Sequence, residues 1–221
     1  ETSKILGDKG INLVAASYQG GLLSRDHKKT HFDHFRRRLD LCEALNIKTV
    51  NLLADFPEGL QPSDLEKSVT TMGEAAAWAE ASKVRVALKF LRTSPFCTNL
   101  ATAIDLVHLV GKDNFGICLD VFHYYTGASK LDDLDLVKPN KLFHVQVCDI
   151  AGVARELATD RDRIFPGEGD FRLTPLVKKI KEMGYKGWLS LELLNPQIWQ
   201  AKPSQIIELG VGSLNRLLAN P

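Results

Sequence analysis

Short apolar runs alternate with longer amphipathic segments along this chain, and this alternation limits its possible folds more than any other feature. Seven runs have the length of strands and are bounded by turn residues or by a helical pattern. They cover residues 11–17, 48–56, 84–90, 115–121, 141–148, 163–165 and 188–194. Helical spacing of apolar residues occurs between them, over residues 31–45, 62–81, 98–110, 131–137, 173–183 and 204–218. Strands that alternate with helices in this way form parallel β/α units.

Two architectures fit a series of parallel β/α units, a (β/α)8 barrel and an open doubly wound sheet. No GxGxxG motif follows the first run, which argues against a dinucleotide-binding sheet. A barrel has eight strands and about 250 residues, whereas this chain has 221 residues and seven runs. We therefore predict an α/β fold, a (β/α)8 TIM barrel forming a single domain over residues 1–221. The missing run predicts that the first β/α unit is absent or truncated.

Composition and charge argue against several classes of partner. With 28 Lys and Arg against 27 Asp and Glu, the formal net charge is +1, which gives no electrostatic basis for binding nucleic acid or a membrane. No apolar stretch reaches the roughly 20 residues that a bilayer requires. The first residues are polar and do not resemble a leader, so we expect a cytoplasmic protein. Barrels of this type often form dimers, and a homodimer is compatible with the sequence.

The cysteines give no sign of a zinc knuckle or a disulfide framework. Cys42, Cys97, Cys118 and Cys148 are far apart, and no CxxC pair occurs. Most of them lie in apolar surroundings, so we predict reduced core residues.

The two faces of each predicted strand differ in character, because successive side chains point to opposite sides. One face is aliphatic and suits packing beneath helices, at Val84, Val86, Leu88, Ile117, Leu119, Val145, Val147, Leu189, Leu191 and Leu193. The other face points into the barrel, and near the carboxyl ends of four runs it carries Lys89, Asp120, His144 and Glu192. Barrel enzymes have their catalytic residues at that end, so we predict the active site there.

Each of these four residues also has a purely structural explanation. A single Asp at a strand end commonly caps the next helix, and a single His is commonly a hydrogen-bonded core residue. Four such groups on converging strands favour a functional site, because burying ionisable groups without partners is costly. A shared metal ion or mutual pairing offsets that cost. Asp120, His144 and Glu192 are ligand types suited to Mn²⁺, Mg²⁺, Co²⁺ or Zn²⁺.

Other polar residues near the same end are candidates for substrate binding. They are His123, Gln146, Asp149, Arg155 and Arg163. An arginine in the loop after the fifth run could clamp a hydroxyl or carboxylate group, and a surface salt bridge is the alternative. Residues 166–170, Pro-Gly-Glu-Gly-Asp, predict a tight turn.

Five segments together resemble the xylose-isomerase-like TIM barrels. They are residues 118–123 (CLDVFH), 144–146 (HVQ), 166–170 (PGEGD), 184–187 (GYKG) and 190–192 (SLE). That superfamily includes sugar-phosphate isomerases and epimerases, inosose dehydratase, dehydroshikimate dehydratase and endonuclease IV. The resemblance implies a divalent metal held by Asp120, His144 and Glu192, and a substrate-binding role for His123. It also implies that Glu192 acts as a catalytic base.

The sequence departs from the family pattern at Lys89. The resemblance implies a fourth metal ligand, a glutamate, where this chain has Ala87-Leu88-Lys89-Phe90. A protonated lysine has no lone pair for a metal. Two alternatives follow: a metal bound more weakly by three ligands, or Lys89 supplying the positive charge while it pairs with Asp120 and Glu192. In both, we assign catalytic roles to Lys89 and Glu192.

Three functions are compatible with this pattern. The first is a metal-dependent isomerase or epimerase that moves a proton next to a carbonyl in a sugar, polyol or keto-sugar. The second is a lyase such as a dehydratase, which needs one strong base. The third is a degenerate barrel that binds a small carbohydrate without converting it, which the lysine at position 89 favours.

Overall fold

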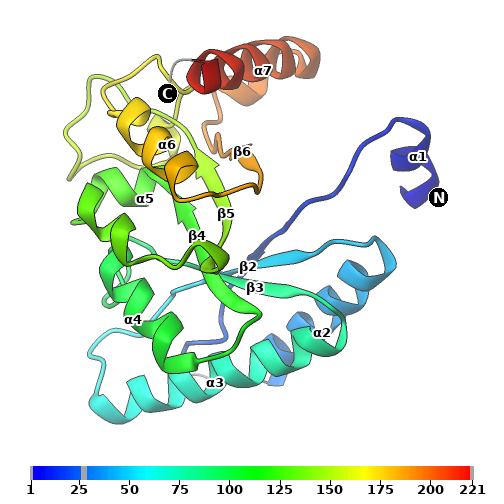
Figure 1. Ribbon diagram of the computed structural model, residues 1–221, viewed down its shortest axis with the longest axis vertical. Coiled ribbons are helices and arrows are strands. Elements are labelled where there is room, and N and C mark those ends of the chain that lie inside the picture. The colour runs from blue at the N-terminus through cyan, green and yellow to red at the C-terminus, as the bar shows by residue number, and fades with distance from the viewer. Residues whose placement is uncertain (1, 26–28, 220–221) are drawn as a thin grey trace.

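The computed structural model describes residues 2–25 and 29–219, and its centre is a parallel sheet of six strands. The strands are β1 (Ala16–Gln19), β2 (Thr49–Leu53), β3 (Arg85–Lys89), β4 (Phe115–Asp120), β5 (Leu142–Val147) and β6 (Leu189–Leu191). Each strand is hydrogen-bonded to the next in chain order, so β1 and β6 form the two edges. The sheet twists strongly between β3 and β5 (Figure 1), which gives it the shape of part of a barrel wall.

The helices that connect successive strands along the outer side of the sheet are α2 (Lys29–Ala44), α3 (Pro62–Ala81), α4 (Leu100–Val110), α5 (Val121–Thr126) and α6 (Leu173–Glu182). A further helix, α1 (Thr2–Asp8), precedes β1, and α7 (Pro203–Ala219) follows β6. Short 3-10 turns occur at Leu131–Leu136, Pro139–Lys141, Asp160–Asp162 and Ile198–Gln200. Figure 1 shows α3 running beside β2 and β3, with α4, α5 and α6 along β4 and β5. This arrangement confirms the predicted α/β fold of the barrel type.

Local sequence signals fix the ends of α4, which places the chain for the next strand. The side chain of Asn99 accepts a hydrogen bond from the backbone N–H of Thr102 at 3.0 Å and so caps the first turn. Gly111 ends the helix with φ of 64°, a left-handed conformation that glycine adopts without strain.

The predicted division of each strand into two faces is confirmed. The main hydrophobic core contains the outward aliphatic residues of β3, β4 and β5 together with the inner faces of α2, α3, α4 and α6. Two inward residues, Ala87 and Cys118, belong to a separate small apolar group inside the barrel wall. The free, buried cysteines of the described chain also match the prediction.

Two of the predicted strands differ in the structure. The first strand was predicted over residues 11–17, but β1 begins at Ala16. Its partner β2 begins at Thr49 and pairs Val50 with Ala16, so the preceding residues have no strand beside them. The run at 163–165 forms no strand of the sheet. Ile164 instead makes a single antiparallel bridge with Asp149, since the loop after β5 folds back on itself. Across residues 2–25 and 29–219 the sheet therefore has six strands, where seven were predicted.

The chain before β1 lies apart from the sheet. Figure 1 shows α1 standing away from the other helices at the end of an extended segment. No residue of α1 is buried, and the sequence analysis had not predicted this helix. Without a packed apolar face, a helix of seven residues has little intrinsic stability.

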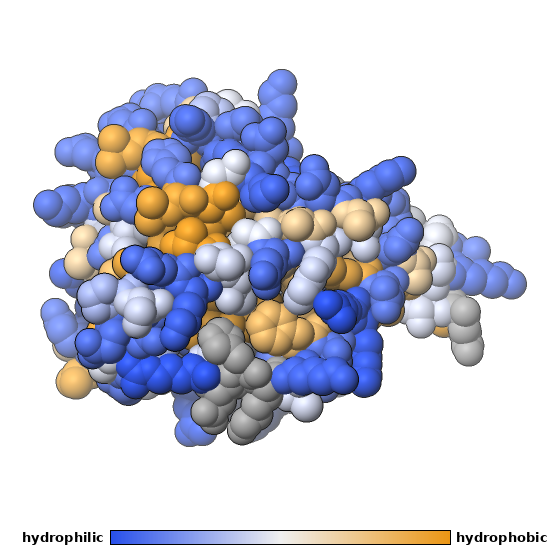
Figure 2. Space-filling model, turned by 90° about the horizontal axis from the view of Figure 1, so that it is seen from below, coloured by the Kyte–Doolittle hydropathy of each residue, from blue (hydrophilic) through white to orange (hydrophobic). Residues whose placement is uncertain are grey.

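The surface seen from below is mostly hydrophilic, with one group of hydrophobic side chains near the middle of the view (Figure 2). Among the described residues, no helix has both the length and the apolar character that crossing a membrane requires.

Candidate functional site

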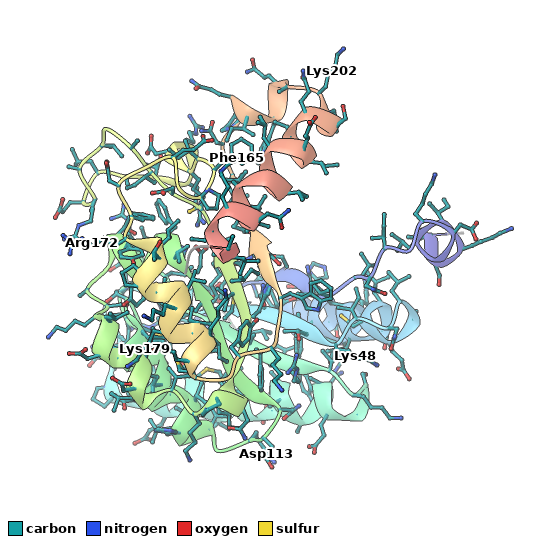
Figure 3. The ribbon with its side chains drawn as sticks, turned by 45° about the horizontal axis from the view of Figure 1, so that its top comes forward. Lys48, Asp113, Phe165, Arg172, Lys179 and Lys202 are labelled. Carbon is teal, nitrogen blue, oxygen red and sulfur yellow. The ribbon has the colours of Figure 1, made fainter. Side chains whose placement is uncertain are left out.

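The polar groups of the candidate site lie at the carboxyl end of the sheet. Figure 3 separates the two ends: Lys48 and Asp113, which precede β2 and β4, lie low in the view, and Phe165 and Arg172 of the loop after β5 lie higher. Parallel strands bring their carboxyl ends together at one edge, where loops can cover them. The residues predicted from the sequence are found at the upper end.

Asp120, the last residue of β4, is the centre of a buried ion cluster. Its Oδ2 lies 2.7 Å from Lys89 Nζ, at the end of the neighbouring strand β3. Arg163 donates to both carboxylate oxygens, at 3.0 Å to Oδ1 and 2.9 Å to Oδ2. The Asp120 Oδ1 also accepts the backbone N–H of Phe122 at 2.9 Å, which caps α5. The structural explanation, an aspartate that caps the next helix, thus holds for Asp120, and its functional role stays a prediction.

Arg163 reaches Asp120 from the loop after β5 and is fully buried. Its Nε donates to Asp160 at 2.7 Å, and its guanidinium carbon lies 4.3 Å from the centre of the Phe122 ring. The amide of Asn195 donates to the Arg163 carbonyl at 3.1 Å. A guanidinium held by two carboxylates and an aromatic ring is rigid, so Arg163 orients Asp120.

Glu192 follows β6 directly, and its backbone N–H donates to the Val147 carbonyl at 3.1 Å. Its Oε2 accepts a hydrogen bond of 2.7 Å from the amide of Gln146, and its Oε1 lies 3.7 Å from Lys89 Nζ. The Glu192 side chain is 15% exposed, against 6% for Lys89 and none for Asp120. Of these three ionisable side chains, that of Glu192 is the most exposed.

The charges of this cluster support one another. Burial alone lowers the pKa of Lys89, but the carboxylates of Asp120 and Glu192 outweigh burial and raise it. Burial raises the pKa of Asp120, yet Lys89 and Arg163 hold it well below its ordinary range. Burial raises the pKa of Glu192, against the attraction of Lys89. The cluster thus holds a protonated ammonium, a firmly ionised aspartate and a glutamate that accepts a proton more readily than usual.

His144 lies deeper in the barrel and belongs to a neutral network. One ring nitrogen, Nδ1, lies 3.0 Å from the amide nitrogen of Asn51 on β2, and Nε2 lies 2.7 Å from the Ser190 hydroxyl on β6. In the sheet register His144 pairs with Cys118, whereas Gln146 pairs with Asp120. Burial and the nearby Lys89 lower the pKa of His144 to about 4. The imidazole is therefore uncharged at neutral pH.

His123, on the first turn of α5, lies beside the ion cluster. Its Nε2 is 3.9 Å from Asp120 Oδ2, and its Nδ1 accepts the backbone N–H of Arg92 at 3.4 Å. Burial lowers the pKa of His123 to about 4, although Asp120 opposes that shift. A neutral imidazole can donate or accept a hydrogen bond, which suits a contact with a substrate hydroxyl.

Asp149 shapes the loop after β5. Its buried carboxylate accepts backbone N–H groups of Ile150, Gly167 and Phe171, at distances between 2.9 and 3.0 Å. A Cβ at Gly169 would lie 2.1 Å from the Ile150 carbonyl oxygen, so only glycine fits there. The predicted tight turn at residues 166–170 is thus folded around Asp149, and this loop presents Arg163 to Asp120.

The structure brings most of the predicted site residues together. Lys89, Asp120, His123, Gln146, Arg163 and Glu192 form one connected group, with His144 in the layer below. Arg155 is exposed on the same loop and donates to the Tyr125 carbonyl at 3.2 Å, away from the cluster. The substrate-binding roles of His123, Gln146, Asp149, Arg155 and Arg163 stay predictions.

Sequence reasoning assigned no role to three residues that hold the site. Asn51 and Ser190 are the hydrogen-bond partners of His144, and Asp160 is the second carboxylate on Arg163. Asn51 carries a usable signal, since it is a polar residue in the middle of an apolar run. Asp160 carries none, because its position depends on how the loop folds.

The side chains in this arrangement do not fit a divalent metal. Within the ranges that the structure describes, no group of three or more His, Cys, Asp or Glu residues is arranged to hold one. Both oxygens of Asp120 are engaged by cations, and both nitrogens of His144 have neutral partners. The ammonium of Lys89 lies beside the carboxylates that a metal would need.

Comparison with known proteins agrees with the fold. Residues 1–217 match the family described as xylose isomerase-like TIM barrel. The chain belongs to this family. A crystal structure of the IolI protein with a bound zinc atom superimposes with a TM-score of 0.90 at 23% identity, covering 99% of this chain and 82% of that one. This similarity confirms the fold.

Two curated relatives from different enzyme classes match this family member in sequence. An inosose isomerase of Halalkalibacterium halodurans is 32% identical over 180 residues, which cover 79% of this chain and 63% of the relative. A 3-dehydroshikimate dehydratase of Pseudomonas aeruginosa is 27% identical over 177 residues, which cover 77% of this chain and 27% of the relative. The chain thus spans less than two thirds of either relative.

Proposed function

We propose that the protein is an isomerase or epimerase that transfers a proton next to a carbonyl group of a sugar, polyol or keto-sugar. The observation that carries the proposal is the Glu192 carboxylate. It is partly exposed at the carboxyl end of the sheet, oriented by Gln146 and 3.7 Å from a lysine ammonium. A carboxylate fixed beside a cation suits the abstraction of a proton whose removal creates negative charge. The inosose isomerase relative supports the same class.

The proposed step uses Glu192 as a general base. The carboxylate takes the proton from the carbon next to the carbonyl. The C–H electron pair forms a C=C bond, and the carbonyl π electrons move to the carbonyl oxygen, which gives an enediolate. For the isomer, the adjacent hydroxyl gives its proton to the former carbonyl oxygen, and the proton on Glu192 goes to the former carbonyl carbon. For the epimer, water gives a proton to the opposite face of the first carbon, and Glu192 returns its own proton to the resulting hydroxide. His123 lies beside the cluster and is suited to bind a substrate hydroxyl.

The resemblance implies that a divalent metal, Mn, Mg, Co or Zn, is bound by Asp120, His144 and Glu192. Because these residues have other partners in the structure, the proposed step passes through none of these ions. Glu192 and the neighbouring cation are sufficient to describe proton removal and charge stabilisation.

A dehydratase is the second candidate function. One observation favours it: among the described side chains of the cluster, only Glu192 is an accessible carboxylate, and two-base epimerisation needs a second base on the opposite face. The similarity to a 3-dehydroshikimate dehydratase supports this second candidate. With one base, removal of the same proton would be followed by loss of a hydroxyl group as water.

Proton NMR in D2O tests the proposal with a panel of ketoses and inososes. The wild type is expected to replace the hydrogen next to the carbonyl by deuterium and to form an isomer or epimer. Glu192→Gln keeps the shape and the Gln146 contact but removes the base, so exchange should fall about 10²–10⁴-fold. Glu168→Gln, at an exposed position in the tight turn, is the matched control and should exchange normally.

Three results separate the alternatives. A product that has lost water supports the dehydratase. Binding of a carbohydrate by the wild type without exchange supports a barrel that binds but does not convert. Near-normal exchange by Glu192→Gln contradicts the assignment of the base.

A further inference from the structure

We propose that the ammonium group of Lys89 takes the place of a metal ion in this chain and is the cation that binds the substrate oxygen on which negative charge develops. The inference rests on the proposed function for its catalytic part. Its structural part, that the site is built around an ammonium and does not take up a divalent ion, stands by itself.

The position of the ammonium carries the first step. Lys89 Nζ lies 2.7 Å from Asp120 Oδ2 and 3.7 Å from Glu192 Oε1, and so between the two carboxylates predicted to bind a metal. Metal–carboxylate bonds are about 2.0–2.2 Å long. An ion that touched both carboxylates would have to occupy the space that the ammonium fills. Two positive charges at such a distance repel strongly in a buried site.

The second step concerns Asp120, which has no coordination capacity left. Arg163 binds its two oxygens in a bidentate pair, and the Phe122 N–H takes a further lone pair of Oδ1. Arg163 is fully buried and is itself held by Asp160, so it has no open path away from Asp120. Metal binding would require breaking a buried, bidentate ion pair.

The third step concerns the layers of the barrel. On β5, the residue paired with Asp120 is Gln146, whose side chain is an amide. His144 is paired with Cys118, one layer below. The imidazole of His144 is hydrogen-bonded to Asn51 and Ser190, and among the described residues it makes no hydrogen bond to Asp120 or Glu192. Within the described residues, the three predicted ligands thus face different partners and do not converge on one point.

The ammonium is also placed to act on a substrate. It sits at the end of β3, where parallel pairing with both β2 and β4 fixes the backbone. An ammonium has three N–H donors, and Asp120 accepts one of them, while Glu192 Oε1 at 3.7 Å is beyond hydrogen-bond length. A carbonyl oxygen that approaches the accessible Glu192 carboxylate therefore meets an unused donor of a fixed cation. Such a donor stabilises the developing enediolate.

Thermal unfolding with and without Mn²⁺, Co²⁺ and Zn²⁺ tests the structural part, on the wild type, Lys89→Glu and Lys89→Gln. The melting temperature of the wild type should not respond to these ions. Lys89→Glu frees the lone pair of Asp120 Oδ2 that the ammonium now takes, removes the competing charge and adds a third carboxylate beside Asp120 and Glu192. Its melting temperature should therefore rise by several degrees with metal, since a ligand that binds the folded state stabilises it. Lys89→Gln is the matched control. It removes the charge without adding a carboxylate, and its response should be much smaller.

The proton-exchange assay tests the catalytic part on the same preparations. Lys89→Gln should exchange about 10²–10³-fold more slowly than the wild type, as expected for the loss of one charge-stabilising donor. EDTA should leave the wild-type rate unchanged.

The outcomes are separable. A wild type that is stabilised by metal as much as Lys89→Glu overturns the inference and leaves proton transfer by Glu192 intact, and this wild-type result does not depend on whether a variant folds. A wild type that ignores metal but exchanges no proton overturns the proposed function and supports the structural part. Exchange by Lys89→Gln at the wild-type rate overturns the catalytic part.

Discussion

The buried polar residues inside the barrel form two groups, a charged half at the carboxyl end of the sheet and a neutral half around His144, one layer below. The two groups keep ionisable side chains buried in different ways. In the charged half, Lys89, Asp120 and Arg163 are buried as a bonded set of ions. In the neutral half, His144 is buried as an uncharged ring between Asn51 and Ser190. Buried ionisable groups need partners or must lose their charge. The comparison shows that this chain satisfies both halves with its own side chains.

This difference predicts which substitutions should destabilise the fold most. Removing one member of a buried ion pair leaves an uncompensated charge, whereas removing one member of a neutral network leaves only unsatisfied hydrogen-bond groups.

Asp120→Ala should give the largest loss of stability. It leaves Lys89 and Arg163 buried without their shared carboxylate and removes the cap of α5. We expect the free energy of unfolding to fall by about 3–5 kcal/mol, measured by urea denaturation. Asp160→Ala is the matched control, because Asp160 is 50% exposed and should cost less than about 1 kcal/mol. Equal losses in the free energy of unfolding for the two variants would show that the buried ion cluster stabilises the fold no more than the half-exposed ion pair.

His144→Ala should have a smaller effect, although the histidine is also buried. It leaves the side chains of Asn51 and Ser190 without their partner, which costs about 1–3 kcal/mol, and the lost ring leaves a cavity that adds to this. The same urea experiment measures it. Ser190→Ala, which removes only one hydrogen bond of the network, should lie below it. A loss as large as that of Asp120→Ala would contradict the distinction between the halves.

Much of this comparison can be derived from the sequence. Strand parity places Lys89, Asp120 and Glu192 at one end of neighbouring strands, and the structure joins them. Parity also places His144 on the inner face, but it does not give the layer. That depends on the register of β4 and β5, which shifts between Ile117 and Cys118. Register is a property of paired strands, and the alternation of side chains within one strand does not reveal a local shift against its neighbour.

The parts that sequence reasoning missed depend on contacts far apart in the chain. Asn51 meets His144 across 93 positions. Arg163 reaches Asp120 only because Asp149 gathers the loop's backbone N–H groups. The run at 163–165 has the pattern of a strand, but that loop leaves it only one bridge to Asp149. Local patterns predict elements well and predict the folding of a long polar loop poorly.

Acid should weaken the fold through the buried histidines. Burial lowers the pKa of His144 to about 4, with Lys89 adding to the shift and Asp120 opposing it. The unfolded chain, with an ordinary histidine pKa of about 6.5, binds more protons in the range between these values. The free energy of unfolding should therefore fall as the pH drops from about 6.5 towards 4, by at most about 2 kcal/mol for this histidine by pH 5.

Urea unfolding at pH 7 and pH 5 measures this dependence. His144→Gln removes the titrating ring and should show a shallower dependence than the wild type. His108→Gln, at an exposed position on α4, should follow the wild type. If the free energy of unfolding of His144→Gln changed with pH as much as that of the wild type, burial of His144 would not disfavour its protonated form, which would contradict the prediction.

Arg155→Ala should have the smallest effect on stability. Arg155 is exposed and donates a hydrogen bond to the Tyr125 carbonyl. We expect a change within about 0.5 kcal/mol in the free energy of unfolding. A clear rise in the KM of the proton-exchange reaction, with stability unchanged, would place Arg155 in substrate binding as the sequence predicted.

Elemental analysis tests the central claim most directly. The wild type would be incubated with excess Mn²⁺, Co²⁺ and Zn²⁺, separated from free ions by gel filtration, and its metal content measured against its protein concentration. Because the Lys89 ammonium occupies the space between Asp120 and Glu192, the account predicts a content close to zero. A content near one ion per chain that is lost in Asp120→Asn would contradict it.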